Sequence, residues 1–360
     1  MLWNPPRQLH ELGQSLWLDN ITRDVLDNGA LQRYIDELSI SGLTSNPTIF
    51  DNAITKSAAY DREIHNQLTR GIHGEALFFV LAIQDLARAA EMLWPVYERS
   101  NTVDGYVSLE VSPVLAHDAE ATVSQANALY QQANRPNLLI KIPGTEEGIP
   151  AIEEAIFAGV PVNVTLLFSV DQYKLAADAY LRGIERRVEA GMSADVRSVA
   201  SLFVSRSDVA VADRVSPELR NRLGLAIGRQ TYKTYRDIFD GARFQRLANA
   251  GARAQRLLFA STGTKDRDAS DTLYVDGLAA PNTINTMPDG TLKAFAEHGT
   301  PPASLPRDGG DSEAVLAAHR AAGIDLSELA TRLQADGASG FVRSWNELLA
   351  AIDSKSKSIG

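Results

Sequence analysis

Short apolar or alternating segments recur along the chain, and longer stretches with helical periodicity separate them. Eight such segments predict β-strands, at residues 15–19, 41–46, 106–112, 137–143, 161–168, 196–206, 255–262 and 272–278. The intervening stretches predict amphipathic helices, for example at 22–40, 74–99, 118–134, 170–190 and 216–239. Strands that alternate with helices are typical of a parallel sheet.

The number of repeats separates two parallel-sheet architectures. Eight strand-helix repeats without an extended linker are the number that closes a (β/α)8 barrel, or TIM barrel. An open doubly wound sheet usually has fewer strands and a glycine-rich first turn, and no Gly-x-Gly-x-x-Gly follows any predicted strand. We therefore predict an α/β protein built on a single TIM barrel.

Two regions extend beyond a minimal barrel. A long helical region at 51–100 separates the second and third predicted strands, and two or three helices follow residue 311. The Pro- and Gly-rich segment 298–311 is the best linker candidate, and we expect the later helices to pack on the barrel. The predicted organisation is one domain over 1–360, with a barrel core at about 13–297, C-terminal helices at about 311–352 and a mobile tail at 354–360.

Composition excludes several functional classes. The 360 residues are 44% hydrophobic and carry a net charge of −10, which argues against nucleic acid or an anionic membrane as the main partner. Neither a secretory signal nor an apolar run of about 18 residues is present, so we expect a cytoplasmic protein. With no cysteine and six scattered histidines, a catalytic metal is not expected, and the chemistry must come from Lys, Asp, Glu and hydroxyl groups.

Polar side chains lie near the carboxyl end of nearly every predicted strand, where a barrel carries its active site. They are Asp19, Asn46, Glu110, Lys141, Asn163, Thr165, Ser201, Arg206 and Ser261. If the strands are assigned correctly, these side chains meet in one cavity.

Lys141 is the most specific of these signals, because it interrupts an apolar strand, Leu-Leu-Ile-Lys-Ile-Pro at 138–143. Burial favours the neutral amine, which attacks a carbonyl carbon and forms a Schiff base. Alternatively, the lysine extends to the barrel rim or pairs with Glu110.

The two carboxyl residues each have a functional and a structural interpretation. Asp19 ends an apolar strand and could act as a general base, or it could cap the following helix. Glu110 lies between Leu109 and Val111, so a raised pKa and proton transfer through a water near Lys141 are plausible. Its alternative role is that of a structural partner for the lysine.

The neutral polar candidates are weaker. Asn46 precedes Pro47, which is typical of a turn as well as of a ligand contact. Asn163 and Thr165 share one face of their strand, although threonine in a strand often reflects β-propensity alone.

An anionic substrate would require a local basic site. Arg206 follows the sixth predicted strand, and the loop Ser-Thr-Gly-Thr-Lys at 261–265 follows the seventh. Barrel enzymes often bind phosphate near strands seven and eight, but a surface turn has a similar composition.

These residues resemble the transaldolase family along nearly the whole barrel and in the expected order. The motifs are Leu-Asp at 18–19, Thr-Ser-Asn-Pro at 44–47, Glu-Val at 110–111, Lys-Ile-Pro-Gly-Thr-Glu-Glu-Gly at 141–148, Asn-Val-Thr-Leu-Leu-Phe-Ser at 163–169 and Ser-Leu-Phe-Val-Ser-Arg at 201–206. The longer region at 51–100 is similar to the larger bacterial transaldolases. Some relatives are fused to a glucose 6-phosphate isomerase, so the resemblance implies a possible covalent or functional association with that enzyme.

The resemblance implies a role for each residue. Lys141 would form the Schiff base, Asp19 would be the acid/base on the C4 hydroxyl, and Glu110 with Thr165 would handle a catalytic water. The implied substrate-binding residues include Thr44, Asn46, Asn163 and Ser201, of which the last three would bind the dihydroxyacetone moiety. Arg206 and Ser261 would bind phosphate. Many family members have an Arg two residues after Ser261, where this chain has Gly263, and we expect Lys265 to supply the missing charge.

The implied reaction transfers a dihydroxyacetone unit from sedoheptulose 7-phosphate to glyceraldehyde 3-phosphate, giving erythrose 4-phosphate and fructose 6-phosphate in the pentose phosphate pathway. It requires no cofactor. One alternative is a fructose 6-phosphate aldolase that uses the same lysine and releases dihydroxyacetone. Another is a catalytically silent barrel that binds sugar phosphates, although that interpretation predicts loss of Lys141, Asp19 or Glu110, and all three are present.

Overall fold

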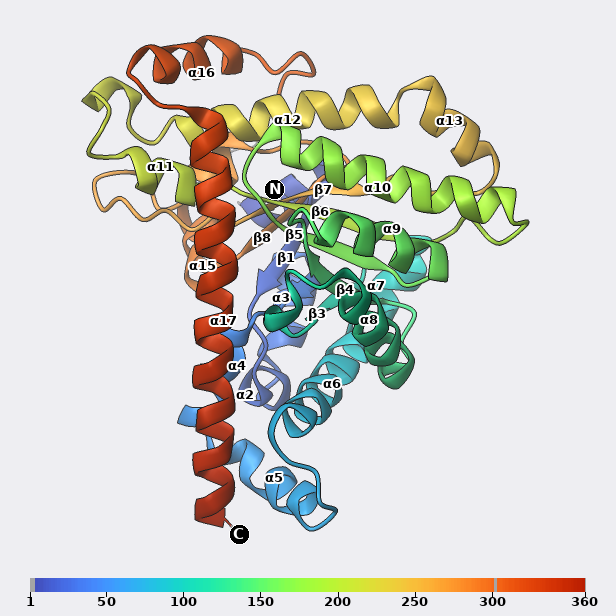
Figure 1. The fold of residues 1–360 in the computed structure, drawn as a ribbon. Helices are drawn as coiled ribbons and strands as arrows, with labels where there is room; N and C mark the ends of the chain where they lie inside the picture. Colours follow the sequence, from blue (N-terminus) through green and yellow to red (C-terminus); the bar gives the residue numbers. More distant parts are fainter. Residues whose placement is uncertain (1–3, 301–302, 360) are drawn as a thin grey trace.

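Eight parallel strands close into one barrel in the computed structural model, which describes residues 4–300 and 303–359 (Figure 1). The strands pair in sequence order, and β1 closes the barrel against β8. They are β1 (Ser15–Asp19), β2 (Ile40–Thr44), β3 (Tyr106–Glu110), β4 (Leu138–Pro143), β5 (Val162–Leu167), β6 (Ser198–Phe203), β7 (Arg256–Ala260) and β8 (Ile284–Met287). The predicted TIM barrel is confirmed, and the strands are rich in buried Leu, Ile and Val, as expected where helices cover a parallel sheet.

The predicted eighth strand was wrong, whereas the other seven are confirmed. Residues 272–278 contain a helix, α14 (Leu273–Gly277), and the barrel closes through β8 instead. A short apolar run does not distinguish a buried strand from a buried helical turn. Here the hydroxyl of Tyr274 donates to the Asp208 carboxylate at 2.8 Å, which holds the turn as a helix. The true strand contains Asn285 and Thr286, whose polarity hides it from the hydrophobic pattern.

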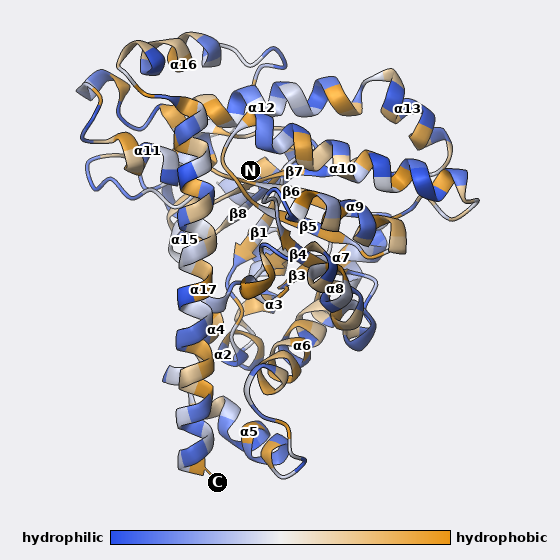
Figure 2. Ribbon diagram, in the orientation of Figure 1, coloured by the Kyte–Doolittle hydropathy of each residue, from blue (hydrophilic) through white to orange (hydrophobic). Residues whose placement is uncertain are grey.

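Helices surround the barrel, and Figure 2 shows hydrophobic colour concentrated on the central strands, with mixed colour on the outer helices. Those that precede the fourth strand are α1 (Pro5–Leu12), α2 (Arg23–Asp27), α3 (Ala30–Leu38), α4 (Pro47–Lys56), α5 (Asp61–Leu68), α6 (Gly74–Met92), α7 (Trp94–Arg99) and α8 (Ala119–Ala133). Those that follow are α9 (Gly148–Ala158), α10 (Val170–Glu189), α11 (Ser205–Val211), α12 (Leu223–Phe239), α13 (Ala242–Asn249), α14, α15 (Asp289–His298), α16 (Ser312–Ala321) and α17 (Leu326–Ile359). None of the helices in the described residues is both long enough and apolar enough to cross a membrane.

The helix predicted at 22–40 is divided into α2 and α3. Gly29 adopts a left-handed conformation, with φ of 72°, which a residue with a side chain rarely adopts. The side chain of Asn28 then accepts from the backbone N–H of Ala30 and starts the second helix. Local turn chemistry therefore breaks an apolar periodicity that continues across it.

The extra helices predicted between the second and third strands and at the C-terminus are confirmed. The helices α4 to α7 lie between β2 and β3, and α17 runs past the barrel to lie against α4, α5 and α6 (Figure 1). Trp345 of α17 is 2% exposed and packs edge-on against Phe78 of α6, with the ring centroids 4.9 Å apart. Aromatic packing therefore joins the last helix to the insertion.

The helix α17 continues through the segment predicted to be a mobile tail. The ammonium of Lys355 lies 2.7 Å from the Asp61 carboxylate of α5 and donates to the carbonyl oxygen of Ile54 at 2.7 Å. Residues 354–359 are thus helical, while Gly360 lies outside the described residues. The mobility of the tail and the division into core and C-terminal parts stay predictions.

Trp345→Ala should lower the free energy of unfolding by about 3–5 kcal/mol, because it leaves a cavity among buried aromatic rings. Urea unfolding followed by circular dichroism measures the loss. Asn346→Ala, at the neighbouring exposed position, is the control and should change stability by less than about 0.5 kcal/mol. Equal effects of the two substitutions would contradict the packing of α17 against α6.

Candidate active site

A cavity of about 500 Å³ opens at the carboxyl ends of the strands. All the predicted site residues line it except Glu110 and Asn163, which are buried beside it. The lining members of the prediction are Asp19, Thr44, Asn46, Lys141, Thr165, Ser201, Arg206, Ser261 and Lys265. The structure therefore gathers these lining residues from six strands and the loops that follow them, and Glu110 adds a seventh strand, β3, beside the cavity.

Lys141 lies within the barrel and does not extend to the rim, since only 6% of the residue is exposed. Its Nζ donates to the carbonyl oxygen of Ser45 at 3.0 Å and lies 3.6 Å from Oε2 of Glu110. The register between β3 and β4 places Glu110 directly beside Lys141. The pairing that the sequence left open is present, and the amine still faces the cavity.

Asp19 is positioned by a neighbouring strand rather than by the helix that follows it. Its carboxylate accepts from the Thr44 hydroxyl at 2.7 Å, whereas the N-cap of α2 is Thr22. Burial raises the pKa of Asp19 above its ordinary value, while the positive charges of Lys141 and Arg206 oppose that rise. The helix-cap interpretation of Asp19 was wrong, and the carboxyl group is free to face the cavity.

Glu110 is a second buried carboxyl group with a raised pKa. Burial is the main cause, the charge of Lys141 lowers the pKa, and the charge of Asp19 raises it further. Among the described residues, neither Oε2 of Glu110 nor the hydroxyl of Thr165 has a hydrogen-bond partner. Buried oxygens of this kind usually bind water, so these two atoms are suited to hold one near Lys141.

Asn163 lies behind the cavity wall. Its amide nitrogen donates to the Ser108 hydroxyl at 3.1 Å, and its amide oxygen accepts from the Ser201 hydroxyl at 2.7 Å. Asn163 is 0% exposed, whereas Ser201 borders the cavity. The structure therefore places Asn163 where it orients Ser201.

Asn46 has the turn structure that one of its two sequence interpretations predicted, and it also borders the cavity. Its side-chain oxygen accepts from the backbone N–H of Ile49 at 3.1 Å and so caps α4, with Pro47 at the first position of the helix. The residue also lines the cavity. The turn chemistry holds the side chain at the edge of the site.

Positive charge is concentrated on one side of the cavity. Arg206, in α11, lies over the Phe203 ring with its guanidinium carbon 5.0 Å from the centroid. The hydroxyl groups of Ser205 and Ser261 are 3.0 Å apart. A Cβ atom placed on Gly263 would lie 3.8 Å from Nζ of Lys265, so the Lys265 amine occupies space beside residue 263.

Several residues of the site were missed by the sequence analysis. Thr286 of β8 lines the cavity, with its hydroxyl 2.8 Å from that of Thr44, and it was missed because β8 was misassigned. Leu333 and Phe341 of α17 also line the cavity. A Cβ on Gly337, between them in sequence, would lie 2.9 Å from a methyl carbon of Leu166.

The close approach of α17 therefore depends on a glycine. The glycines at 337 and 340, inside a long helix, were the sequence signal for this contact. No local pattern indicates which strand such a glycine faces.

A closed barrel that buries a lysine beside carboxyl groups at this face is typical of enzymes that capture carbonyl substrates as Schiff bases. The chain belongs to the transaldolase/fructose-6-phosphate aldolase family, which it matches over residues 16–352. In the described residues, no group of three His, Asp or Glu side chains is arranged to hold a metal ion.

Similar proteins are named transaldolase. One from Thermobifida fusca (strain YX) is 44% identical over 358 residues, covering 97% of each chain. Another, from Mycobacterium ulcerans (strain Agy99), is 43% identical over 357 residues, covering 96% of each. A third, from Mycobacterium tuberculosis (strain ATCC 25618 / H37Rv), is 44% identical over 351 residues, covering 95% of this chain and 94% of its own.

The raised pKa of Asp19 predicts a pH dependence of stability. The native state binds a proton at Asp19 more tightly than the unfolded state does. Ionisation of this carboxyl group should therefore lower the free energy of unfolding of the wild type as the pH rises from below 3.8, the ordinary pKa, through the higher pKa of the native state. Asparagine does not ionise. The free energy of unfolding of Asp19→Asn, minus that of the wild type, should therefore increase with pH and then level off.

Urea unfolding in steps between about pH 3 and pH 8 measures this difference. Asp24→Asn, at an exposed position in α2, is the control, and its difference from the wild type should change less with pH. If the difference in the free energy of unfolding between Asp19→Asn and the wild type stays constant over this pH range, ionisation of Asp19 does not destabilise the folded state.

Proposed function

We propose that this chain is a transaldolase that transfers a dihydroxyacetone unit through a Schiff base on Lys141. The donor is sedoheptulose 7-phosphate, the acceptor is glyceraldehyde 3-phosphate, and the products are erythrose 4-phosphate and fructose 6-phosphate. The observation that carries the proposal is the buried amine of Lys141, 3.6 Å from Glu110 in the same cavity as Asp19. The relatives named transaldolase, similar over nearly their whole length, support the same reaction.

The first step forms the imine. The neutral amine of Lys141 attacks the C2 carbonyl carbon of the ketose phosphate, and the carbonyl oxygen leaves as water after two protonations. Glu110 is placed to take a proton from the lysine ammonium, because burial makes its carboxylate a stronger base. Ser201 and Asn46 border the cavity and supply polar groups for the hydroxyls of the dihydroxyacetone part.

The second step breaks the bond between C3 and C4. Asp19 takes the proton of the C4 hydroxyl, the C4 oxygen becomes an aldehyde, and the bonding electrons move to the protonated imine nitrogen, which gives an enamine. The raised pKa of Asp19 suits it to hold that proton until the acceptor arrives. C3 of the enamine then attacks the acceptor aldehyde, and Asp19 returns the proton to the new hydroxyl.

The last step returns the free enzyme. A water adds to the imine carbon, and the bond between that carbon and Lys141 breaks to release the ketose product. Oε2 of Glu110 and the hydroxyl of Thr165 have no hydrogen-bond partner among the described residues. They are suited to hold this water, and the Glu110 carboxylate is suited to deprotonate it. Control of the same water separates transfer from the aldolase reaction, in which the enamine is protonated and dihydroxyacetone is released.

Phosphate recognition falls to Arg206, Ser261 and Lys265. All three line the cavity, and they follow the neighbouring strands β6 and β7. The position of the Lys265 amine beside Gly263 supports its use in place of the arginine that many relatives carry at that point. Lysine is a point charge, so it supplies attraction with less directional preference than a guanidinium.

Two broader parts of the proposal rest on the sequence alone, the second of them on the family resemblance. The enzyme acts in the cytoplasm, and it associates covalently or functionally with a glucose 6-phosphate isomerase. Copurification of the two activities from cells that make both proteins tests the association, and a consistent lack of it would count against this part.

Borohydride reduction with fructose 6-phosphate and no acceptor should attach a dihydroxyacetone unit to Lys141. Peptide mass mapping locates the adduct. Lys141→Met should lose it and should lose turnover by roughly a thousandfold or more, because methionine has no amine with which to form the imine. The control Lys293→Met, at a lysine with a 61% exposed side chain, should retain both.

Three results would count against the mechanism. They are an unmodified Lys141 in folded enzyme that binds the sugar phosphate, turnover by Lys141→Met, and an adduct on another lysine. Release of free dihydroxyacetone at the rate of transfer would instead favour the aldolase alternative.

Lys265→Ala should raise the KM for glyceraldehyde 3-phosphate about tenfold or more, because a charge-assisted contact to phosphate is lost. The KM for unphosphorylated glyceraldehyde should stay within about twofold, because that acceptor has no phosphate to bind. Arg267→Ala, at an exposed position of the same loop, serves as the matched control. Equal effects of Lys265→Ala on both acceptors would remove Lys265 from the phosphate site.

A further inference from the structure

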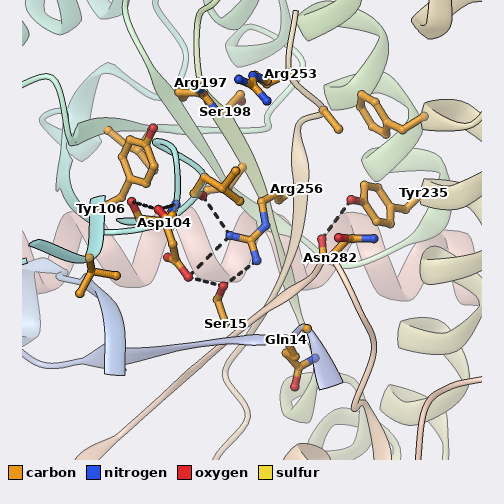
Figure 3. Close-up of a pocket in the computed structure, with 18 of the residues that line it drawn as sticks. Gln14, Ser15, Asp104, Tyr106, Arg197, Ser198, Tyr235, Arg253, Arg256 and Asn282 are labelled. Atoms are coloured by element: carbon orange, nitrogen blue, oxygen red, sulfur yellow. Dashed lines mark hydrogen bonds and ion pairs between the residues drawn. The ribbon is translucent and has the colours of Figure 1, made fainter. Parts of the chain in front are cut away.

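A second cavity, of about 730 Å³, lies at the opposite end of the barrel (Figure 3). Ser15, Ser198 and Arg256 are the first residues of β1, β6 and β7, and all three line it. It therefore opens at the amino ends of the strands, away from Lys141. The proposed transaldolase reaction makes no use of this cavity.

The lining of this amino-end cavity is strongly basic. Five arginines border it, against two aspartates, Asp104 and Asp240. The arginines are Arg99, Arg197, Arg236, Arg253 and Arg256. This excess of positive charge stands out in a chain whose net charge is −10, and it gives the cavity a potential that attracts anions.

Two of the arginines pair with the two aspartates that line the cavity. Arg236 makes two contacts with the Asp240 carboxylate, at 3.1 and 3.2 Å. Arg256 donates to the hydroxyl of Ser15 at 2.7 Å and lies 3.9 Å from Asp104, as Figure 3 shows. These pairs neutralise both aspartates that line the cavity, so neither carboxylate opposes the charge of the arginines that have no acidic partner.

Of the remaining three arginines, two are available to a ligand. Arg197 is committed, because it pairs through Nε with Asp195 at 2.8 Å and donates through Nη2 to the hydroxyl of Thr102. Among the described residues, the guanidinium groups of Arg99 and Arg253 have no hydrogen bond or ion pair to a side chain or backbone. Nε of Arg256 is also buried without a partner among them.

Barrel pairing brings two of these arginines to one rim of the cavity. Val199 of β6 pairs with Arg256 of β7, so the segments that precede the two strands are neighbours. The hydroxyl of Tyr180 contacts the carbonyl oxygens of both Val196 and Arg253 and so holds these segments together. Figure 3 shows Arg197 and Arg253 on the same side of the pocket.

Apolar side chains complete the wall of the cavity. Val96, Tyr106, Leu139 and Phe239 line it beside the arginines. Burial raises the pKa of Tyr235, which also lines the cavity, to about 12, so this phenol adds no negative charge at neutral pH. Ligand sites commonly combine an apolar wall with a few placed charged groups and have volumes of about 300–1,000 Å³.

We propose that this amino-end cavity binds a small organic anion that carries a phosphate group. Guanidinium groups pair with phosphate oxygens through two parallel hydrogen bonds. The guanidinium groups of Arg99 and Arg253 have no partner among the described residues, so they supply such donors without breaking a contact there. The apolar wall takes the organic part of the ligand. This site is separate from the sugar phosphate site around Lys141.

Calorimetric titration with pyrophosphate tests the site, because pyrophosphate has no carbonyl group and cannot react with Lys141. At low salt it should bind to the wild type, and the double variant Arg99→Ala/Arg253→Ala should bind it about tenfold more weakly or worse. Arg246→Ala removes an equal charge at an exposed position of α13 outside the cavity. That control should keep the affinity within about twofold.

A second double variant separates the two ends of the barrel. Arg206→Ala/Lys265→Ala alters the catalytic cavity and should leave the affinity of the amino-end cavity unchanged. The proposal would be overturned if Arg206→Ala/Lys265→Ala lost pyrophosphate binding while Arg99→Ala/Arg253→Ala kept it. It would also be overturned if the wild type did not bind pyrophosphate. Equal affinity for citrate would overturn the assignment to phosphate, and matching thermal midpoints verify that all variants are folded.

Discussion

The burial of the Lys141 amine is the constraint on which the site depends. A lysine with 6% exposure must have a partner or lose its charge, because an isolated ammonium is costly away from water. Glu110 and the carbonyl oxygen of Ser45 supply that partner, and each comes from a different part of the barrel. The barrel must therefore close for the lysine amine to be buried beside these partners and still face the substrate cavity.

The two carboxyl groups show how the same burial is used for chemistry. Desolvation disfavours the ionised form of both Asp19 and Glu110, and the charge of Asp19 disfavours ionised Glu110 further, while the charge of Lys141 favours both ionised forms. Their raised pKa values weaken the folded state at neutral pH but suit both groups to accept and return protons. Thr44 holds Asp19, so the proton acceptor keeps its orientation without an additional charge.

The molecule carries basic groups at both ends of the barrel despite its acidic composition. At the carboxyl ends, Arg206 and Lys265 lie near the nucleophile. At the amino ends, Arg99 and Arg253 lie on a cavity whose aspartates are already paired. Net charge therefore describes the average surface, whereas local placement decides where an anion binds.

The sequence alone determined the fold class, seven of the eight strands and most of the polar residues that line the catalytic cavity. Those features depend on local periodicity and on polar residues at the ends of apolar strands, which a linear pattern contains. The tertiary structure decided the rest, including β8, the burial of Asn163 behind Ser201, the entry of α17 into the site, and the amino-end cavity. These features arise from contacts between segments far apart in the chain, and local periodicity carries no information about which distant residue fills a given space.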